Sequence, residues 1–212
     1  MRFVPLIFGI FGTVVLVSFG LWQLQRAEWK DGLLGEMEAR LGEAPVALPA
    51  APDADADRFR AVALKGRIVG DPFAVFGTWR GAGAGYKIFA PFETDGRRVI
   101  VDFGVAPKAD VMLPETEIAL TGNLHFVNET EASPEADVWT NQDVAAMAAR
   151  SGAAPVLVVA RESISPAIRA VPLDTAGISD NHMGYAVQWF GLAIVWAGMA
   201  GYFVWRQRKG TA

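Results

Sequence analysis

The stretch GYAVQWFGLAIVWAGMAGYFVW, residues 184–205, contains no charged residue over 22 positions and decides the class of fold. A second uncharged run of the same length occupies residues 3–24. As a helix, each run would be about 30 Å long, which matches the hydrocarbon core of a bilayer. We therefore expect a membrane protein with a hairpin of two transmembrane helices, at residues 1–26 and 181–206.

The first run has the position of a signal peptide but not its pattern. It is longer than the apolar region of about 7–15 residues that signal peptides have. It also continues into WQLQR, residues 22–26, without a small-x-small cleavage site. We expect it to remain in the protein as a membrane span.

The charges beside the second run predict its orientation. Arg206, Arg208 and Lys209 follow the run, whereas residues 171–183 before it contain no Lys or Arg. Because positively charged flanks stay in the cytoplasm, the tail at residues 207–212 and both termini should be cytoplasmic. The middle of the chain would then lie outside the cytoplasm.

The segment between the two runs is acidic. Residues 27–181 contain all 23 acidic residues and 14 of the 19 Lys and Arg residues, a net charge of −9. Such a surface repels phosphate groups, so no nucleic-acid partner is expected. The chain has no Cys, which excludes disulfides, covalent haem attachment through C-x-x-C-H and thiolate metal sites.

This middle segment divides into a connector and a domain. Residues 27–57 should form a helical extension and then a linker, because residues 44–57 are mostly Ala, Pro and Asp. Residues 58–180 should form an antiparallel, β-rich α+β domain outside the cytoplasm. Asp95-Gly96 predicts a hairpin turn, and Asn141 is expected to cap a helix through Arg150 with Gly152 near its end. The expected strands are Phe59–Val69, Phe73–Trp79, Tyr86–Glu93, Arg97–Val105, Thr116–Val127 and Pro155–Arg161.

Motifs of catalysis and ion binding are incomplete in this domain. RGAGAGY, residues 80–86, lacks the last Gly of a dinucleotide loop and the Gly-Lys-Ser/Thr of a P-loop. Asp53, Asp55 and Asp57 lack the later Gly and Glu of a calcium loop and are expected to be solvated. The NET triplet at residues 128–130 is a weak glycosylation signal. With only two histidines and no Ser, His and acid arrangement to argue from, we expect no enzyme.

His182 begins a stripe of residues that share one face of the second expected helix. The stripe continues through Ala186, Trp189, Ala193 and Trp196, while Tyr185, Gln188 and Leu192 run beside it. An imidazole at the outer membrane interface would thus share a face with two indoles.

Small residues in both runs predict close packing of the two helices. The second run has Ala193, Ala197 and Gly201 at a spacing of four, and Gly184, Gly191 and Gly198 at a spacing of seven. We expect the first run, with Gly9, Gly12, Thr13 and Gly20, to be the packing partner.

The polar residues near His182 have two interpretations. In one, His182, Tyr185 and Trp189 form an interfacial belt, and Gln188 bonds to the neighbouring helix. In the other they form a haem site, because a neutral imidazole ligates iron and aromatic side chains pack on a porphyrin. Polar side chains at membrane depth are costly, which indicates a use, but these residues alone leave both interpretations open.

Four stretches of the sequence carry a family resemblance. In order, they are GLWQLQRAEWK at residues 20–30, RFRAVALKGRI at 58–68, GYKIFAPFETDGRRVIVDFGVAP at 85–107 and NHMGYAVQWFGLAIVW at 181–196. Together they resemble the motifs of the Surfeit locus protein 1 (Surf1/Shy1) family.

The resemblance implies a cytochrome c oxidase assembly factor of an inner membrane that acts when haem a enters the catalytic oxidase subunit. It implies haem a binding through His182, with Tyr185, Gln188 and Trp189 as motif residues that line the pocket or contact the oxidase. The catalytic oxidase subunit and membrane lipid are then the expected partners, and haem a synthase is a further candidate. The alternative is a cofactor-free scaffold that stabilises an oxidase assembly intermediate.

One motif departs from the family. The family commonly reads VDRGWVP where this chain has VDFGVAP, residues 101–107, so that Phe103, Val105 and Ala106 differ. A family role for this strand does not transfer to these positions, whereas the membrane motif is intact. The chain enters a span directly after Met1 and Arg2 without a transit peptide, so we expect a bacterial origin. His125 is a second candidate axial ligand, which its strand setting disfavours.

Overall fold

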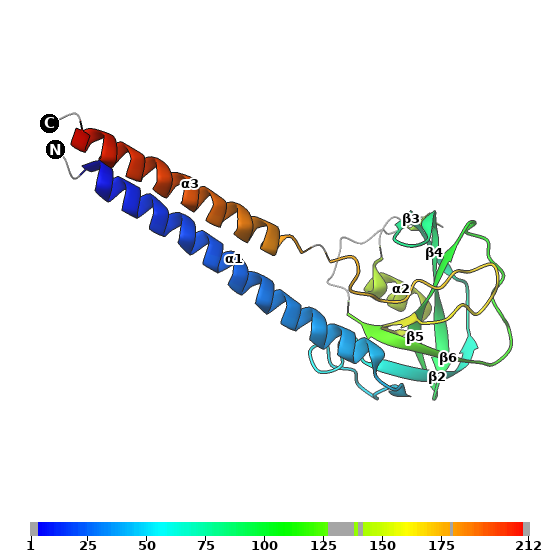
Figure 1. Ribbon diagram of the computed structural model, residues 1–212. Helices are drawn as coiled ribbons and strands as arrows, with labels where there is room; N and C mark the ends of the chain where they lie inside the picture. The colour runs from blue at the N-terminus through cyan, green and yellow to red at the C-terminus, as the bar shows by residue number, and fades with distance from the viewer. Residues whose placement is uncertain (1–3, 127–137, 140–141, 179, 210–212) are drawn as a thin grey trace. The chain divides into compact units, whose positions relative to one another are not determined.

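The computed structural model describes residues 4–126, 138–139, 142–178 and 180–209 (Figure 1). The chain forms two compact units. One unit combines residues 1–36 with 178–212, and the other comprises residues 37–177.

The first unit is a hairpin of two helices. α1 spans Val4–Gly42 and α3 spans His182–Lys209, and Figure 1 shows the two helices antiparallel. α1 continues without a break past the predicted membrane span, and its last turns belong to the second unit. Each helix has a window apolar enough to cross a membrane, and only 11% and 6% of the two windows is buried. The core helix of a soluble protein would be mostly buried, so these helices are consistent with membrane anchoring.

The second unit is built around one β-sheet of mixed direction. Its strands are β1 Val46–Ala47, β2 Ala61–Ile68, β3 Phe73–Trp79, β4 Gly83–Thr94, β5 Arg97–Ala106, β6 Ile118–His125, β7 Val138–Trp139 and β8 Ala154–Ala160. They lie in the order β1-β2-β6-β8-β5-β4-β3-β7. Because β2 pairs with both β6 and β4, the strands β2, β6, β8, β5 and β4 close into a barrel.

The predicted strands are confirmed as β2, β3, β4, β5, β6 and β8, and so is a β-rich domain flanked by two apolar helices. Asp95 and Gly96 have φ of 47° and 73°, the positive values that the predicted hairpin turn requires. The all-antiparallel expectation is wrong, because β8 pairs in parallel with β5, β1 with β2 and β7 with β3. Hydrophobic periodicity identifies strands, but the closure of the barrel decides their neighbours.

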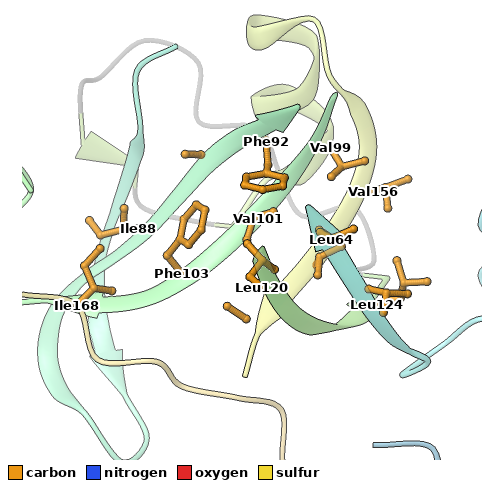
Figure 2. Packing of buried hydrophobic residues seen from close by; sticks show 14 of the residues in the cluster. Leu64, Ile88, Phe92, Val99, Val101, Phe103, Leu120, Leu124, Val156 and Ile168 are labelled. Atoms are coloured by element: carbon orange, nitrogen blue, oxygen red, sulfur yellow. The ribbon is translucent and has the colours of Figure 1, made fainter. Parts of the chain in front are cut away.

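Two cores cover the two faces of the barrel wall. In β5, Val99, Val101 and Phe103 belong to the inner core, and Ile100 belongs to the outer core beneath α2, Val144–Ser151. Figure 2 shows the inner set together with Phe92, Leu64 and Leu120. Because both faces are covered, β5 reads as a nearly continuous apolar run. Phe103 and Ala106, which depart from the family pattern, are both buried in the inner core.

α2 is capped by a different residue from the predicted one. Oδ1 of Asp143 accepts a hydrogen bond from the N–H of Ala146 at 2.8 Å, so Asp143 is the N-cap. Gly152 ends the helix with a φ of 65°, as predicted. Met147 and Ala148 of this helix belong to the outer core. Asn141 and residues 128–130 lie outside the described residues.

The Ala, Pro and Asp stretch, which its composition predicted to be a linker, contacts the β-rich unit at several points. β1 lies in this stretch, and Leu48 joins the inner core with 7% of its surface exposed. The guanidinium of Arg97 donates hydrogen bonds to the carbonyl oxygens of Leu48 and Ala50, at 2.7 and 2.6 Å. A few such contacts with residues distant in the sequence hold a segment whose own propensity for helix or strand is weak.

The expected solvation of the three Asp residues holds only in part. Asp57 is 6% exposed and forms an ion pair with Arg60 at 2.5 Å, and its carboxylate also accepts from the N–H of Asp53. Oδ1 of Asp53 accepts from the N–H groups of Asp55 and Ala56. These backbone hydrogen bonds hold the pKa of Asp53 below its usual range. Among the described residues no group of three or more His and acidic side chains could hold a metal ion. The carboxylates of Asp53 and Asp57 accept backbone hydrogen bonds within this turn.

Candidate functional site

His182 lies at the first position of α3. Oδ1 of Asp180 accepts a hydrogen bond from the backbone N–H of His182 at 3.0 Å, and the N–H of Tyr185 donates to the carbonyl of Asn181. A carboxylate beside the first turn satisfies one of the free N–H groups and complements the positive end of the helix dipole. The sequence around His182 thus fixes the backbone that carries the imidazole.

The imidazole of His182 contacts the other helix of the hairpin. Nδ1 lies 2.8 Å from Oε1 of Gln23 in α1, and both side chains are half-buried. No described residue hydrogen-bonds to Nε2 of the same ring. His182 therefore has one nitrogen engaged with protein and one nitrogen without a protein partner in the described part of the chain.

The predicted stripe on α3 is present and faces α1. Ala186 and Ala193 are buried, with exposed fractions of 1% and 4%. The ring of Trp189 stacks on Phe19 of α1 with centroids 4.9 Å apart, and Nε1 of Trp196 donates to the carbonyl of Gly9 at 3.2 Å. His182, Trp189 and Trp196 therefore lie on the seam between the two helices.

The other two predicted site residues lie outside this seam. Tyr185 and Gln188 are exposed on the flank of α3. The structure brings Trp189 onto the same seam as His182, whereas it places Tyr185 and Gln188 on a surface that other molecules can reach. Their role in a pocket or in contact with the oxidase stays a prediction.

The glycines of the two helices have different roles. Those of α1 face α3, because a Cβ added to any of three glycines would collide with a side chain of α3. Gly9 lies against Ala200, Gly12 against Trp196 and Gly20 against Phe190. The first run is thus the packing partner, as predicted. Of the small residues of α3, Ala193 is buried on the seam as expected, and Gly201 lines a hollow together with Gly9 of α1. The expectation is wrong for Gly184, Gly191 and Gly198, since nothing lies within 4 Å of a Cβ built on any of them. On α3, Ala193, Ala200, Trp189 and Trp196 lie on the seam, whereas Gly184, Gly191 and Gly198 have open space around them.

Gln23 and Phe19 are the site residues that the sequence pattern did not identify. Gln23 is the last polar residue of the first uncharged run, and His182 directly precedes the second. In an antiparallel hairpin these two positions meet at the same end. This positional match is the signal that points to Gln23.

Two apolar hollows lie on the hairpin. One has a volume of about 410 Å³ and is lined by Val14, Val15, Ser18, Phe19 and Trp22, so it begins within about one turn of Gln23. The other has a volume of about 490 Å³ and lies at the opposite end, between Leu6, Gly9 and Ile10 of α1 and Ala197, Ala200 and Trp205 of α3. The first hollow shares Phe19 with the stacked pair on the seam.

His125 is in the β-rich unit, at the end of β6. Its ring stacks on Phe59 at 6.2 Å, and its Nδ1 is buried without a hydrogen-bond partner in the described structure. Burial lowers the pKa of His125, and the nearby charges of Lys87 and Arg58 lower it further. Its role as a second ligand stays a prediction.

Comparison with known proteins gives consistent matches. Residues 10–194 match the family model described as the SURF1 family. Surfeit locus protein 1 of Xenopus tropicalis is 31% identical over 84% of this chain and 69% of that protein. Surfeit locus protein 1 of Rattus norvegicus is 27% identical over 87% of this chain and 71% of that protein. The cytochrome oxidase assembly protein SHY1 of Saccharomyces cerevisiae is 28% identical over 71% of this chain and 45% of that protein.

Proposed function

The chain belongs to the SURF1 family, and from this premise we propose that it is a cytochrome oxidase assembly factor that holds haem a and passes it to the catalytic oxidase subunit. The yeast relative is named for cytochrome oxidase assembly. The haem a step is the more specific part of the proposal, and it depends on the hairpin.

The imidazole of His182 carries this proposal. It lies at the end of the hairpin where both uncharged runs meet polar sequence, and one ring nitrogen has no protein partner among the described residues. A neutral imidazole nitrogen is a common axial ligand of haem iron. His182 is also the only described histidine in this unit.

Aromatic and apolar side chains near His182 support the proposal of a haem as cargo. The stacked rings of Phe19 and Trp189 lie deeper on the same seam, and the hollow of about 410 Å³ beside Phe19 is lined mainly by apolar side chains. Flat aromatic rings and aliphatic groups are the surfaces that pack on a porphyrin and its apolar tail. When bound, haem a supplies an iron centre that accepts a nitrogen ligand. One protein ligand binds more weakly than two, which suits a protein that gives up its cargo.

The proposal includes a membrane topology. Arg206, Arg208 and Lys209 follow the second apolar run, so both termini lie in the cytoplasm and the β-rich domain lies outside it, in the periplasm of a bacterial cell. His182 then lies at the outer leaflet of the inner membrane. A C-terminal reporter that is active only in the cytoplasm should be active, and a reporter at the tip of the Asp95-Gly96 turn should not be.

Absorption spectroscopy tests the haem a step. The full chain is purified in detergent from cells that make haem a, as the wild type and as His182→Ala. We expect a haem a spectrum from the wild type and its loss in His182→Ala. His125→Ala is the matched control, because it removes the other histidine and should leave the spectrum unchanged. A spectrum that survives His182→Ala unaltered removes His182 from the proposal.

A cofactor-free scaffold is the second candidate function, and the outward glycines of α3 favour it. Gly184, Gly191 and Gly198 recur every seven residues with open space around them, which would let a helix of another membrane protein approach closely. If Gly191→Val abolishes oxidase assembly in cells while the purified wild type carries no haem a, the scaffold function is the correct one.

A further inference from the structure

We propose that Gln23 is a positioning residue for His182, whose amide oxygen holds the imidazole in the tautomer that leaves the Nε2 lone pair free for a metal centre. The identity of that metal centre, haem a, rests on the proposed function. The tautomer itself does not, because it follows from the contact between two side chains of this chain.

The donor and acceptor roles follow from the atoms in contact. Oε1 of Gln23 is a carbonyl oxygen and only accepts hydrogen bonds, so its 2.8 Å contact with Nδ1 is a hydrogen bond in the tautomer that carries the proton on Nδ1. In a neutral imidazole, the other nitrogen then has the lone pair. In that tautomer the Nε2 lone pair is free, and Nε2 has no protein partner among the described residues. That combination is what a metal ligand requires.

The packing below the pair fixes the distance between the two helices. Gly20 lies against the ring of Phe190, where any larger side chain would collide. Phe19 stacks on Trp189 at the same level, about one turn from Gln23. At the α3 end, Asp180 anchors the backbone N–H of His182 at 3.0 Å. The hydrogen bond between Gln23 and His182 thus joins two backbones that are already held in place.

An amide suits this position better than a carboxylate would. At the edge of a bilayer a charged acceptor carries a large desolvation cost, whereas a neutral carbonyl oxygen accepts the same hydrogen bond without it. Histidines that ligate metals generally donate their other N–H to a carbonyl or carboxylate, which fixes the tautomer and the orientation of the ring. Gln23 supplies that partner from the neighbouring helix.

The first experiment measures the tautomer of the metal-free protein. The full chain is labelled with ¹⁵N-histidine and studied by NMR in detergent micelles, and His125→Phe assigns the two histidines. We expect the wild-type His182 to carry its proton on Nδ1. Gln23→Leu should shift the ring toward a proton on Nε2, Gln23→Glu should keep the proton on Nδ1, and Gln25→Leu, at an exposed position two residues away, should change nothing.

A shorter amide makes the test independent of how well the Leu variant folds. Gln23→Asn keeps the amide but withdraws its oxygen by one methylene, so it can no longer reach Nδ1. In this variant the proton of the His182 ring should shift to Nε2, as in Gln23→Leu. A wild-type ring with its proton on Nε2 overturns the proposal. A ring that is unchanged in both Gln23→Leu and Gln23→Asn overturns it as well.

The second experiment titrates haem a into the same proteins. We expect binding to weaken by roughly 10- to 100-fold in Gln23→Leu, as is typical when a partner of a metal-ligating histidine is removed, with rescue by Gln23→Glu. If His182→Ala abolishes binding and Gln23→Leu leaves the affinity unchanged, the positioning role is wrong while the proposed function stands. If His182→Ala binds haem a like the wild type, the proposed function fails, and the NMR result alone decides the role of Gln23.

Discussion

Lys87 Nζ lies 2.9 Å from Asp102 Oδ2 on the outer wall of the barrel, where the Asp102 side chain is 1% exposed and the Lys87 side chain 13%. Oδ1 of Asp102 accepts from the N–H of Gly104 at 2.9 Å, whereas Oδ2 has this ion pair but no hydrogen-bond donor at a suitable angle in the described structure. Burial raises the pKa of the Asp102 carboxyl, and the Lys87 ammonium opposes that rise. The carboxylate therefore depends on Lys87 for its charge.

Lys87→Met should destabilise the protein by about 3–5 kcal/mol at pH 7, because it leaves a buried carboxylate without its cation. Without Lys87 the pKa of Asp102 rises further, so the loss should shrink as the pH falls and the carboxyl takes up a proton. Urea denaturation of the full chain in detergent, followed by the β-sheet signal in circular dichroism, measures both effects.

Lys65→Met is the control for that prediction. Lys65 pairs with Glu117 at 3.0 Å, but the two side chains are 78% and 61% exposed. This variant should change the free energy of unfolding by less than about 1 kcal/mol. Equal losses in Lys65→Met and Lys87→Met would show that burial does not govern the Lys87 and Asp102 pair.

The wild-type protein should lose stability at mildly acidic pH because of His125, and His125→Phe should not show this loss. Folding lowers the pKa of His125 below its ordinary value of 6.5, so the unfolded chain binds the proton more readily. The neutral His125 ring therefore makes its full contribution to the free energy of unfolding above pH 6.5. This contribution is lost as the pH falls below that value and the unfolded chain takes up the proton. Phe keeps the stack on Phe59 and has no nitrogen to protonate. Denaturation at pH 5.5 and pH 8 should show a smaller difference in the variant than in the wild type; an equal difference would contradict the prediction.

Gly104→Ala should cost about 2–5 kcal/mol. Gly104 has a φ of 111°, and a Cβ there would collide with the carbonyl oxygen of Arg169, so backbone strain and overlap add. Gly96→Ala is the control, since Gly96 also has a positive φ but faces open space, and its cost should be about 1–2 kcal/mol. Thermal unfolding of both variants gives the comparison, and a larger loss in Gly96→Ala would refute the collision.

Gly12→Val should push the two helices of the hairpin apart by about 1–2 Å, the range over which contact residues change interhelical distances. The side chain would meet the indole of Trp196, whereas Gly191→Val would meet nothing and should leave the spacing unchanged. The chain has no Cys, so spin labels on introduced cysteines at the exposed positions Leu21 and Val187 report the distance by pulsed electron paramagnetic resonance. An unaltered distance in Gly12→Val would contradict this packing.

The sequence alone determined the parts of this protein that depend on local pattern. The length of the two uncharged runs predicted two apolar helices, and alternation with turn residues predicted β2 to β6 and β8. The Asp95-Gly96 turn followed from the same logic, since the conformation that a turn needs is a property of its own residues. The spacing of His182, Trp189 and Trp196 also predicted a shared face, because helical geometry fixes it.

Only the tertiary structure decided which surfaces meet. The parallel pairing of β8 with β5 and the packing of Leu48 depend on residues far apart in the chain, which no local pattern specifies. The same holds for the seam of the hairpin, where Gly9, Gly12 and Gly20 of α1 meet Ala200, Trp196 and Phe190 of α3. The contact between Gln23 and His182 spans 159 positions, and it exists because the packing of two antiparallel helices brings the start of α3 beside the middle of α1.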